Sequence, residues 1–314
     1  TGKVSVWPRL MSILCSCGMT GAADALYRFA TLTCPYPADR PDVVVSAGSF
    51  LAPVNYLISR KFGCLSVCSM VPSGIPLSFF DAVVIPHHDA VRLRRIPQNA
   101  VVTSGAPTPI RPEVLIEPRQ RLGRAWPPRP GTVPVGILIG GNDQNFDMTR
   151  EWSEALVEVL AGMQGVSLYL TTSRRTPPWL ANRLQNARLG CLAYAEFPER
   201  TTDSHYLGIL GISHVLIVTE DSINMMSEAA ASRKPLLILG VPRRTKRPLA
   251  CDATIASFVT SGARRLAPAD IRMLPTCISD LMKRSCPAST GEAWQDCLRS
   301  LLSRTATRRT GSLR

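Results

Sequence analysis

At 314 residues, with 45% apolar and 19% charged residues, the chain has the length of two ordinary domains and the composition of a folded rather than a disordered protein. Its longest apolar runs, VPVGILI and SHVLIV, are far shorter than the ~20 residues of a membrane-spanning helix, which excludes that class. The formal net charge is +13, and the sequence from Pro242 onward contains 14 Lys and Arg but five Asp and Glu. We therefore expect that part to attract nucleotide phosphates, an anionic membrane surface or nucleic acid.

The first part of the chain alternates short β-rich runs with a helical segment. PDVVVSAGSFLAPVNYLISRKFG predicts a buried strand, a small-residue turn and a helix that ends near Gly63. CLSVCSM, DAVVIP and AVVTSG follow as short runs bounded by Pro, Gly and Ser, which is the spacing of a parallel sheet with crossover connections. We therefore predict a Rossmann-like N-terminal lobe over residues 1–117.

A linker is predicted over residues 118–132, because EPRQRLGRAWPPRPGT is rich in Pro, Arg and Gly and favours neither helix nor strand. Beyond it, VPVGILIGG predicts a strand and DMTREWSEALVEVLAGM predicts an amphipathic helix capped by Asp147. Strand and helix then alternate at doubly wound spacing, which gives a second Rossmann-like lobe over residues 133–290. Residues 291–314 are predicted to hold a closing helix around EAWQDCLRSLL and a basic tail.

Two loops of the second lobe carry the residue types of a phosphate site. Gly140 and Gly141 lie between a strand and a helix, so the backbone there can approach a diphosphate closely, although a plain tight turn explains the glycines equally well. Later, SHVLIVTEDSINMMSEAAASRKP predicts a strand, a polar turn and a small-residue helix capped by Asp221 or Ser222. Glu228 lies in an apolar stretch of that helix, where a carboxylate needs a partner, either a ribose diol or a nearby Arg.

A third group of polar residues, His87, His88 and Asp89, follows the strand DAVVIP at the edge of the sheet where α/β proteins bind ligands. His88, oriented by Asp89, is our candidate general base, because an imidazole that titrates near neutrality suits the removal of a proton from a substrate hydroxyl. A turn-stabilising His–Asp pair is the alternative. A basic run after the strand PLLILG fits a ligand phosphate, anionic lipid or a solvated charge run, and comprises Arg243, Arg244, Lys246 and Arg247.

Together, IGGNDQNFDMT, TEDSINMMSEAAASRKPLLILG, the PHHD turn and VVTSGAPTPI resemble the elongated-mitochondria fission-protein family, whose bacterial members are described as glycosyltransferase-like. The resemblance covers roughly residues 41–241 and implies a GT-B-type architecture, with two Rossmann-like lobes, parallel sheets and a nucleotide-sugar donor held mainly by the second lobe. In similar transferases the glycine loop meets the diphosphate, a role that falls here to Gly140, Gly141 and Asn142. A Glu on the later helix holds the ribose, which is Glu228 by position. The residues that would line the cleft beside it are Thr219, Asp221, Ser222 and Asn224.

The resemblance favours a transferase that moves a sugar from a nucleoside-diphosphate sugar to a hydroxyl acceptor, with a membrane-attached acceptor as one option. We expect no metal and no cofactor beyond the donor, because this fold transfers sugars without a DxD-bound metal and the ten cysteines match no CxxC or zinc spacing. The first, acceptor-side lobe is expected to be incomplete or diverged, since no strand with a Gly-rich turn is evident before Cys15.

The alternative is a non-catalytic adaptor of the mitochondrial fission type, which recruits a division protein. The expected location is cytoplasmic, with peripheral membrane attachment as an option, at the mitochondrial outer surface if the source is eukaryotic. No nucleic-acid partner is expected, because the chain has no helix-turn-helix, RRM or zinc-finger pattern and its basic residues are not interleaved with aromatic ones.

Overall fold

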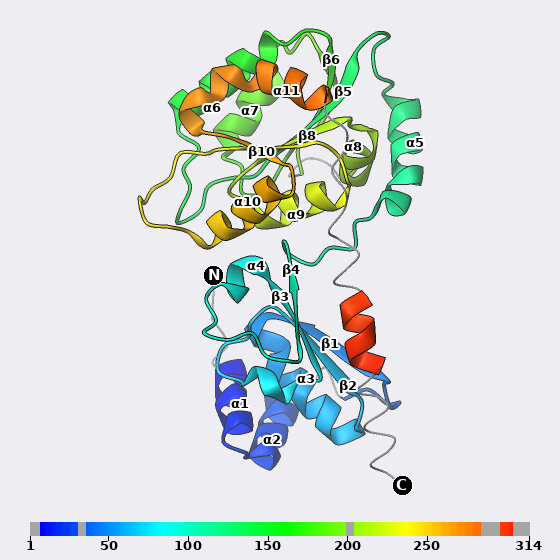
Figure 1. Ribbon diagram of the computed structural model, residues 1–314, viewed down its shortest axis with the longest axis vertical. Helices are drawn as coiled ribbons and strands as arrows, with labels where there is room; N and C mark the ends of the chain where they lie inside the picture. Colours follow the sequence, from blue (N-terminus) through cyan, green and yellow to red (C-terminus); the bar gives the residue numbers. More distant parts are fainter. Residues whose placement is uncertain (1–6, 31–35, 199–203, 284–295, 304–314) are drawn as a thin grey trace. The chain divides into compact units, whose positions relative to one another are not determined.

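The computed structural model describes residues 7–30, 36–198, 204–283 and 296–303, and these form two compact units (Figure 1). The first unit comprises residues 1–103 together with 291–314, and the second comprises residues 104–290. Each is an α/β unit built on a parallel sheet, as the sequence predicts. Among the helices of the described residues, none is both long enough and apolar enough to cross a bilayer.

The first unit has a four-stranded parallel sheet in the order β1-β2-β3-β4. The predicted strands are confirmed, and the helix after the first strand ends at Gly63, whose φ of 65° is the left-handed conformation that glycine adopts without strain. The elements are α1 (Trp7–Ser16), α2 (Thr20–Ala30), β1 (Val43–Ala47), α3 (Gly48–Phe62), β2 (Leu65–Ser69), η1 (Leu77–Phe79), β3 (Ala82–Pro86), α4 (His87–Ala90) and β4 (Ala100–Thr103).

Both faces of this sheet are covered by apolar contacts. On one face a cluster that includes Cys68, Val83 and Ile85 packs against residues of α1, α2 and α3. On the other, Val67, Ala82 and Val84 contact leucines of a helical segment over residues 296–303, namely Leu298, Leu301 and Leu302. The predicted closing helix is thus confirmed for residues 296–303 and packs on the first unit, while the rest of the predicted segment and the basic tail lie outside the described residues.

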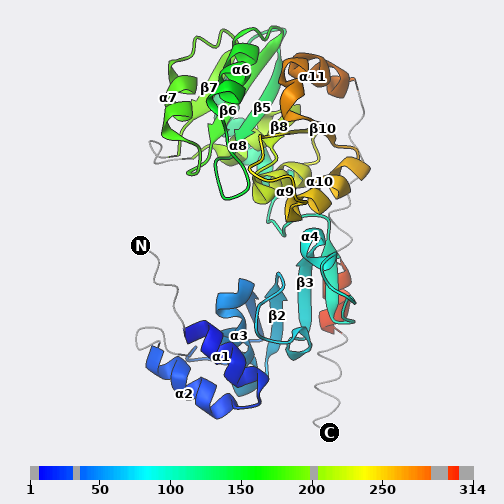
Figure 2. The same ribbon diagram turned by 90° about the vertical axis from the view of Figure 1, so that its left-hand side faces the viewer.

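The second unit has a six-stranded parallel sheet in the order β10-β9-β8-β5-β6-β7. Figures 1 and 2 show helices on both faces of this sheet. Its elements are η2 (Pro112–Leu115), α5 (Ile116–Ala125), β5 (Val133–Ile139), α6 (Arg150–Ala161), β6 (Val166–Thr172), α7 (Pro178–Asn186), β7 (Leu192–Glu196), α8 (Tyr206–Ile212), β8 (Val215–Thr219), α9 (Ile223–Ala231), β9 (Leu236–Leu239), α10 (Ala250–Thr260), β10 (Arg264–Leu266), η3 (Pro268–Met273) and α11 (Leu274–Met282).

The chain reverses direction across this sheet after its third strand. It runs outward from β5 to β6 and β7, crosses back to β8 on the other side of β5, and then runs outward again to β9 and β10. Right-handed crossovers therefore place α6 and α7 on one face and α8 and α9 on the other. The four inner strands, β5, β6, β8 and β9, are almost fully buried, as expected when helices cover both faces.

The expectation that residues 118–132 form a linker without helix is wrong for its first half, which belongs to α5. Pro118 is the third residue of this helix, where the missing N–H is one that the helix leaves unpaired in any case. Leu122 is fully buried against α8, where a Cβ on Gly208 would lie 2.9 Å from the Leu122 Cβ. Tertiary packing on α8 therefore stabilises a helix that local composition disfavours, and the predicted boundary lies inside the second unit, which begins at Ser104.

Candidate functional site

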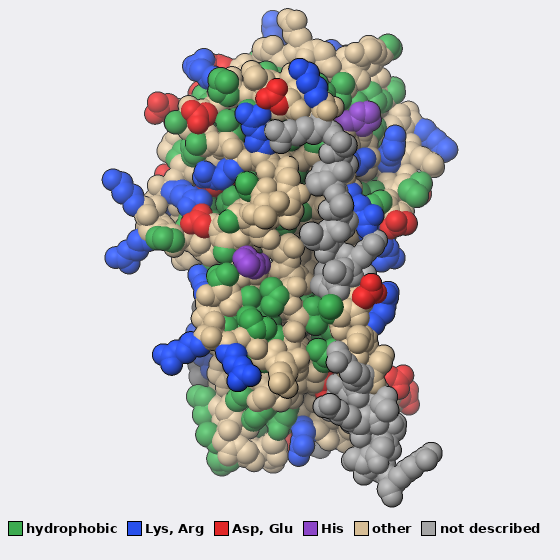
Figure 3. Space-filling model, viewed as in Figure 1, with side chains coloured by type: hydrophobic (Ala, Val, Ile, Leu, Met, Phe, Trp, Pro, Cys, Tyr) green, Lys and Arg blue, Asp and Glu red, His purple; other side chains and the backbone are tan. Residues whose placement is uncertain are grey.

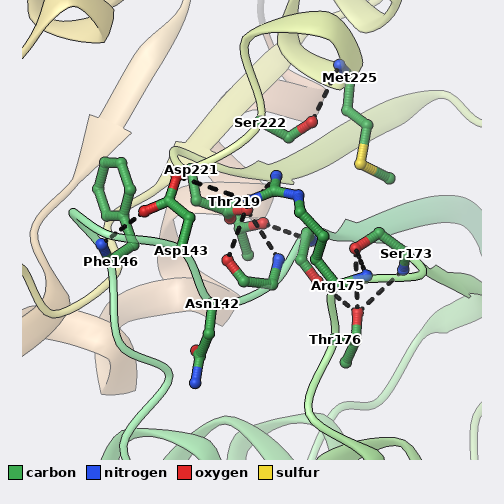
Figure 4. A network of polar contacts seen from close by, with 12 residues as sticks. Asn142, Asp143, Phe146, Ser173, Arg175, Thr176, Thr219, Asp221, Ser222 and Met225 are labelled. Carbon is green, nitrogen blue, oxygen red and sulfur yellow. Dashed lines mark hydrogen bonds and ion pairs between the residues drawn. The ribbon is translucent and has the colours of Figure 1, made fainter. Parts of the chain in front are cut away.

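The candidate site lies where the strand order of the second sheet reverses. β5 pairs with β6 on one side and with β8 on the other, and the chain leaves these strands in opposite directions. In open α/β sheets the loops diverge at such a switch point and leave a crevice at the C-terminal ends of the strands. The glycine loop after β5, the loop of residues 173–177 after β6 and the polar turn after β8 all belong to this edge (Figure 4).

The glycine loop is packed tightly against its neighbours. The amide of Gly140 donates to Thr219 Oγ1 at 2.7 Å, and that of Gly141 donates to Asp221 Oδ2 at 2.7 Å. A Cβ on Gly140 would lie 2.1 Å from Asp221 Oδ2, and one on Gly141 would lie 2.0 Å from the carbonyl carbon of Arg175. The two glycines are therefore required by close contacts inside the protein, and both amides already have protein acceptors.

Asp221 is the buried centre of this arrangement, and its side chain has no exposed surface. Its Oδ2 accepts from Gly141 and from the Arg175 guanidinium at 3.0 Å, whereas its Oδ1 is buried without a hydrogen-bond partner among the described residues. Burial raises the pKa of Asp221, and the Gly141 amide and the charge of Arg175 oppose that rise. The carboxylate therefore points inward and supports the loop, and the helix cap is Ser222, whose Oγ accepts from the Met225 amide.

The rest of the glycine loop is held by polar contacts as well. Asn142 donates from its amide to the carbonyl oxygen of Arg175 at 3.2 Å, and its Oδ1 accepts from the Met148 amide at 2.7 Å. Asp147 does not cap α6, contrary to the sequence prediction, because Thr149 takes that position and accepts from the Trp152 amide. The Asp147 carboxylate instead forms an ion pair with Arg244 at 3.0 Å.

Glu220, next to Asp221, is fully buried between two arginines. Its carboxylate lies 3.1 Å from Arg243 Nε and 2.8 Å from Arg265 Nη2. Arg243 also pairs with Asp252 at 2.7 Å, which joins the loop after β9 to α10. Arg243 and Arg244 are therefore paired within the protein, so the basic run they belong to is not simply a solvated charge run. On the face drawn in Figure 3, described Lys and Arg side chains occur singly or in small groups.

Helix α9 begins at the same edge and carries the candidate ribose ligand. Asn224 is exposed in its first turn, and Glu228 is half-buried in its second. The protein partner of Glu228 is the hydroxyl of Tyr206, which donates to Oε2 at 2.5 Å, rather than the arginine that was one of the two predicted alternatives. Burial raises the pKa of Glu228, and the Tyr206 hydrogen bond opposes that rise.

His88 and Asp89 belong to the first unit, in the short helix α4 directly after β3. His88 is buried, and its Nε2 lies 3.9 Å from the Asp89 carboxylate. Burial lowers the pKa of His88, while the charge of Asp89 opposes this and Arg92 and His87 add to it. The imidazole is thus biased towards its neutral form, the form that can accept a proton.

Sequence reasoning missed Arg175, Glu220 and Tyr206, which contact the predicted residues. Arg175 and Tyr206 lie 46 and 22 residues from their partners along the chain, and no local pattern links residues so far apart. The sequence could have indicated the role of Glu220, because it directly follows an apolar strand whose five residues are all buried, and a carboxylate at such a position needs a charged partner.

Comparison with known proteins agrees with this fold. A family model described as Mitochondrial fission ELM1 matches residues 5–265. The chain belongs to the mitochondrial fission ELM1 family. It is 24% identical over 233 residues to an uncharacterized protein of Rickettsia prowazekii and 25% identical over 256 residues to the mitochondrial fission protein ELM1 of Arabidopsis thaliana. These matches cover 64% and 72% of this chain and 65% and 56% of the two relatives, so the chain spans less than two thirds of their length.

Two solved structures show that this ELM1-family chain has the architecture of GT-B glycosyltransferases and related epimerases. The UDP-GlcNAc 2-epimerase of Neisseria meningitidis, bound to UDP-GlcNAc, is 13% identical with a TM-score of 0.55, over 93% of this chain and 81% of that one. The glycotransferase of kitacinnamycin is 16% identical with a TM-score of 0.50, over all of this chain and 83% of that one. At these identities the likeness establishes the fold alone, and the predicted family and fold class are both confirmed.

Proposed function

We propose that the protein is a glycosyltransferase that binds a nucleoside-diphosphate sugar at the switch point of its second unit and transfers the sugar to a hydroxyl acceptor. The observation that carries this proposal is the convergence of the glycine loop, Asp221 and α9 at one sheet edge. The first turn of α9 supplies amides and a positive dipole end suited to phosphate. Two solved structures with the same fold, an epimerase bound to UDP-GlcNAc and a glycotransferase, support a nucleotide-sugar substrate.

In this proposal Glu228 binds the ribose hydroxyls. A carboxylate is an acceptor for two hydroxyl donors, and the Tyr206 hydroxyl fixes its orientation at 2.5 Å. Gly140, Gly141, Thr219 and Asp221 shape the floor of the site, because the contacts among them fix the loop between β5 and α6. Asn142, Ser222 and Asn224 complete the surroundings of the phosphates.

His88 is the proposed general base, supported by Asp89. Removing the proton of an acceptor hydroxyl requires a neutral imidazole, and the lowered pKa of His88 favours that form at neutral pH. The same proposal includes a hydroxyl acceptor, which can be attached to a membrane. It also includes departure of the diphosphate without a bound metal or other cofactor.

The test is a thermal-shift screen of the wild type with UDP, GDP, ADP and CDP and their sugars, repeated on Glu228→Gln. Gln keeps an acceptor for Tyr206 and removes the charge, so stability changes less than ligand binding. We expect one nucleotide to raise the Tm of the wild type and to lose most of that effect in the variant. Glu154→Gln is the matched control, because Glu154 is a half-exposed glutamate of α6 that pairs with Arg183.

A second candidate function is a non-catalytic adaptor that recruits a division protein to a membrane. Membership of the mitochondrial fission ELM1 family favours it. The two proposals separate on His88→Ala. A transferase loses sugar transfer and keeps nucleotide binding in this variant, whereas an adaptor shows no transfer in the wild type and binds its partner equally well in the variant.

A further inference from the structure

Arg175 lies at the switch point between two carboxylates. It belongs to the loop that follows β6, the strand next to β5. Its Nη2 donates to Asp221 at 3.0 Å, and its Nη1 lies 3.6 Å from Asp143 Oδ2 and 3.5 Å from the carbonyl oxygen of Gly141 (Figure 4). The Arg175 side chain is 42% exposed, whereas that of Asp221 is fully buried. The guanidinium therefore has a buried side that is anchored and an outer side that faces solvent.

A diphosphate needs hydrogen-bond donors and positive charge, and the backbone of the glycine loop does not supply them in this structure. The amides of Gly140 and Gly141 donate to Thr219 and Asp221, and the Asn142 amide donates to the Arg175 carbonyl oxygen. Three successive amides are thus already used inside the protein. A ligand at this loop would have to be met by side chains.

The contacts of Arg175 leave it able to bind an anion. Only the 3.0 Å contact to Asp221 has the length of a charge-assisted hydrogen bond, because the two contacts of Nη1 are at the limit or beyond it. A guanidinium has five N–H donors in a planar fork that matches phosphate oxygens. Arg175 can therefore keep its bond to Asp221 and give its other donors to a phosphate.

We propose that Arg175 binds the diphosphate of the donor nucleotide and makes the site selective for nucleoside diphosphates over monophosphates. This inference rests on the proposed function. Asp221 anchors the guanidinium from the buried side, and Asp143, whose side chain is 31% exposed, competes with the phosphate for the outer donors. Arg244, a partly exposed arginine of the loop after β9, instead makes 3.0 Å and 3.3 Å contacts to Asp147 and the Phe146 carbonyl oxygen, which suit a structural role.

The experiment is calorimetric titration of the full chain with UDP, GDP, ADP and CDP and the matching monophosphates. Arg175→Gln is compared with Arg174→Gln, which makes the same change of charge at the exposed neighbouring residue of the same loop. We expect Arg175→Gln to weaken binding of the preferred diphosphate by about tenfold or more and to change monophosphate binding by less than about threefold. Asp143→Asn, which removes the competing charge, is expected to strengthen diphosphate binding.

Because Arg175→Gln leaves the buried Asp221 without its cation, the double variant Arg175→Gln/Asp221→Asn is measured alongside it. In the double variant both substituted side chains are neutral, and this variant must show the same selective loss of diphosphate binding. Equal diphosphate affinity in Arg175→Gln and Arg174→Gln, or an equal loss for both diphosphate and monophosphate, overturns the inference and leaves the proposed function standing. A wild type that binds none of these nucleotides overturns the proposed function and the inference with it.

Discussion

Replacing Gly141 by Ala tests whether the glycine loop is built on close internal contact. The added Cβ would lie 2.0 Å from both the carbonyl carbon and the carbonyl oxygen of Arg175 and 2.4 Å from the Thr176 amide nitrogen. These are backbone atoms, so no side-chain rotation relieves the clash, and the two loops must separate by about 1.5 Å to reach ordinary carbon contact distance. The separation would also stretch the 2.7 Å bond from the Gly141 amide to Asp221.

Overpacking of this kind costs about 3 kcal/mol, at the upper end of the range for small-to-large changes, because backbone rather than a flexible side chain must move. For a unit of this size that loss lowers Tm by about 6–12 °C. The assay is thermal unfolding followed by circular dichroism, with Gly190→Ala as the control. A Cβ on Gly190 meets nothing within 4 Å, so its Tm should stay level or rise slightly. A Gly141→Ala protein that melts within about 2 °C of the wild type would refute the reasoning.

Three other predictions concern buried and half-buried groups of the same unit. Glu220→Gln should lower the free energy of unfolding, measured by chemical denaturation, by about 3–5 kcal/mol, because two arginines lose their buried counter-charge. Glu154→Gln, at a half-exposed ion pair, should lower it by under about 1 kcal/mol, and similar losses in the two variants would contradict this. Tyr206→Phe should lower stability by about 1–3 kcal/mol by depriving Glu228 of its donor, and an unchanged midpoint would count against the bond. The pKa of Asp221 is raised in the folded state, so the folded protein binds a proton on this carboxyl more tightly than the unfolded chain does. Stability therefore falls as pH rises from about 4 through the folded pKa. The free energy of unfolding of the wild type should therefore drop relative to Asp221→Asn as pH rises, and a difference that does not vary with pH would refute this sign.

The sequence was sufficient for the strands and for the position of the two loops. Runs such as VPVGILI and VLIV are apolar on both faces, which is the signature of a parallel strand covered by helices, and they form β5 and the first four residues of β8. Polar residues after such strands had to gather at one sheet edge. The parallel order of the sheet, rather than any local motif, brings Gly141 to Asp221 across 80 residues.

What the sequence did not predict depends on tertiary contact. Helix α5 is stabilised by packing of Leu122 on α8, which local composition does not reveal. The sequence left open whether the glycines make room for a ligand or form a plain tight turn, whereas in the structure the absence of their Cβ atoms permits close contacts with Asp221 and Arg175. The partner of Glu228 is a tyrosine at the start of another helix, a pairing that periodicity and spacing do not encode.

The central claim is that a nucleoside-diphosphate sugar binds at the switch point of the second unit, and hydrogen–deuterium exchange with and without nucleotide tests it most directly. We predict that the nucleotide selected by the thermal-shift screen slows amide exchange in three segments that are remote in sequence, residues 140–149, 173–177 and 219–228. Protection confined to other segments, or no protection at saturating nucleotide, would contradict the claim.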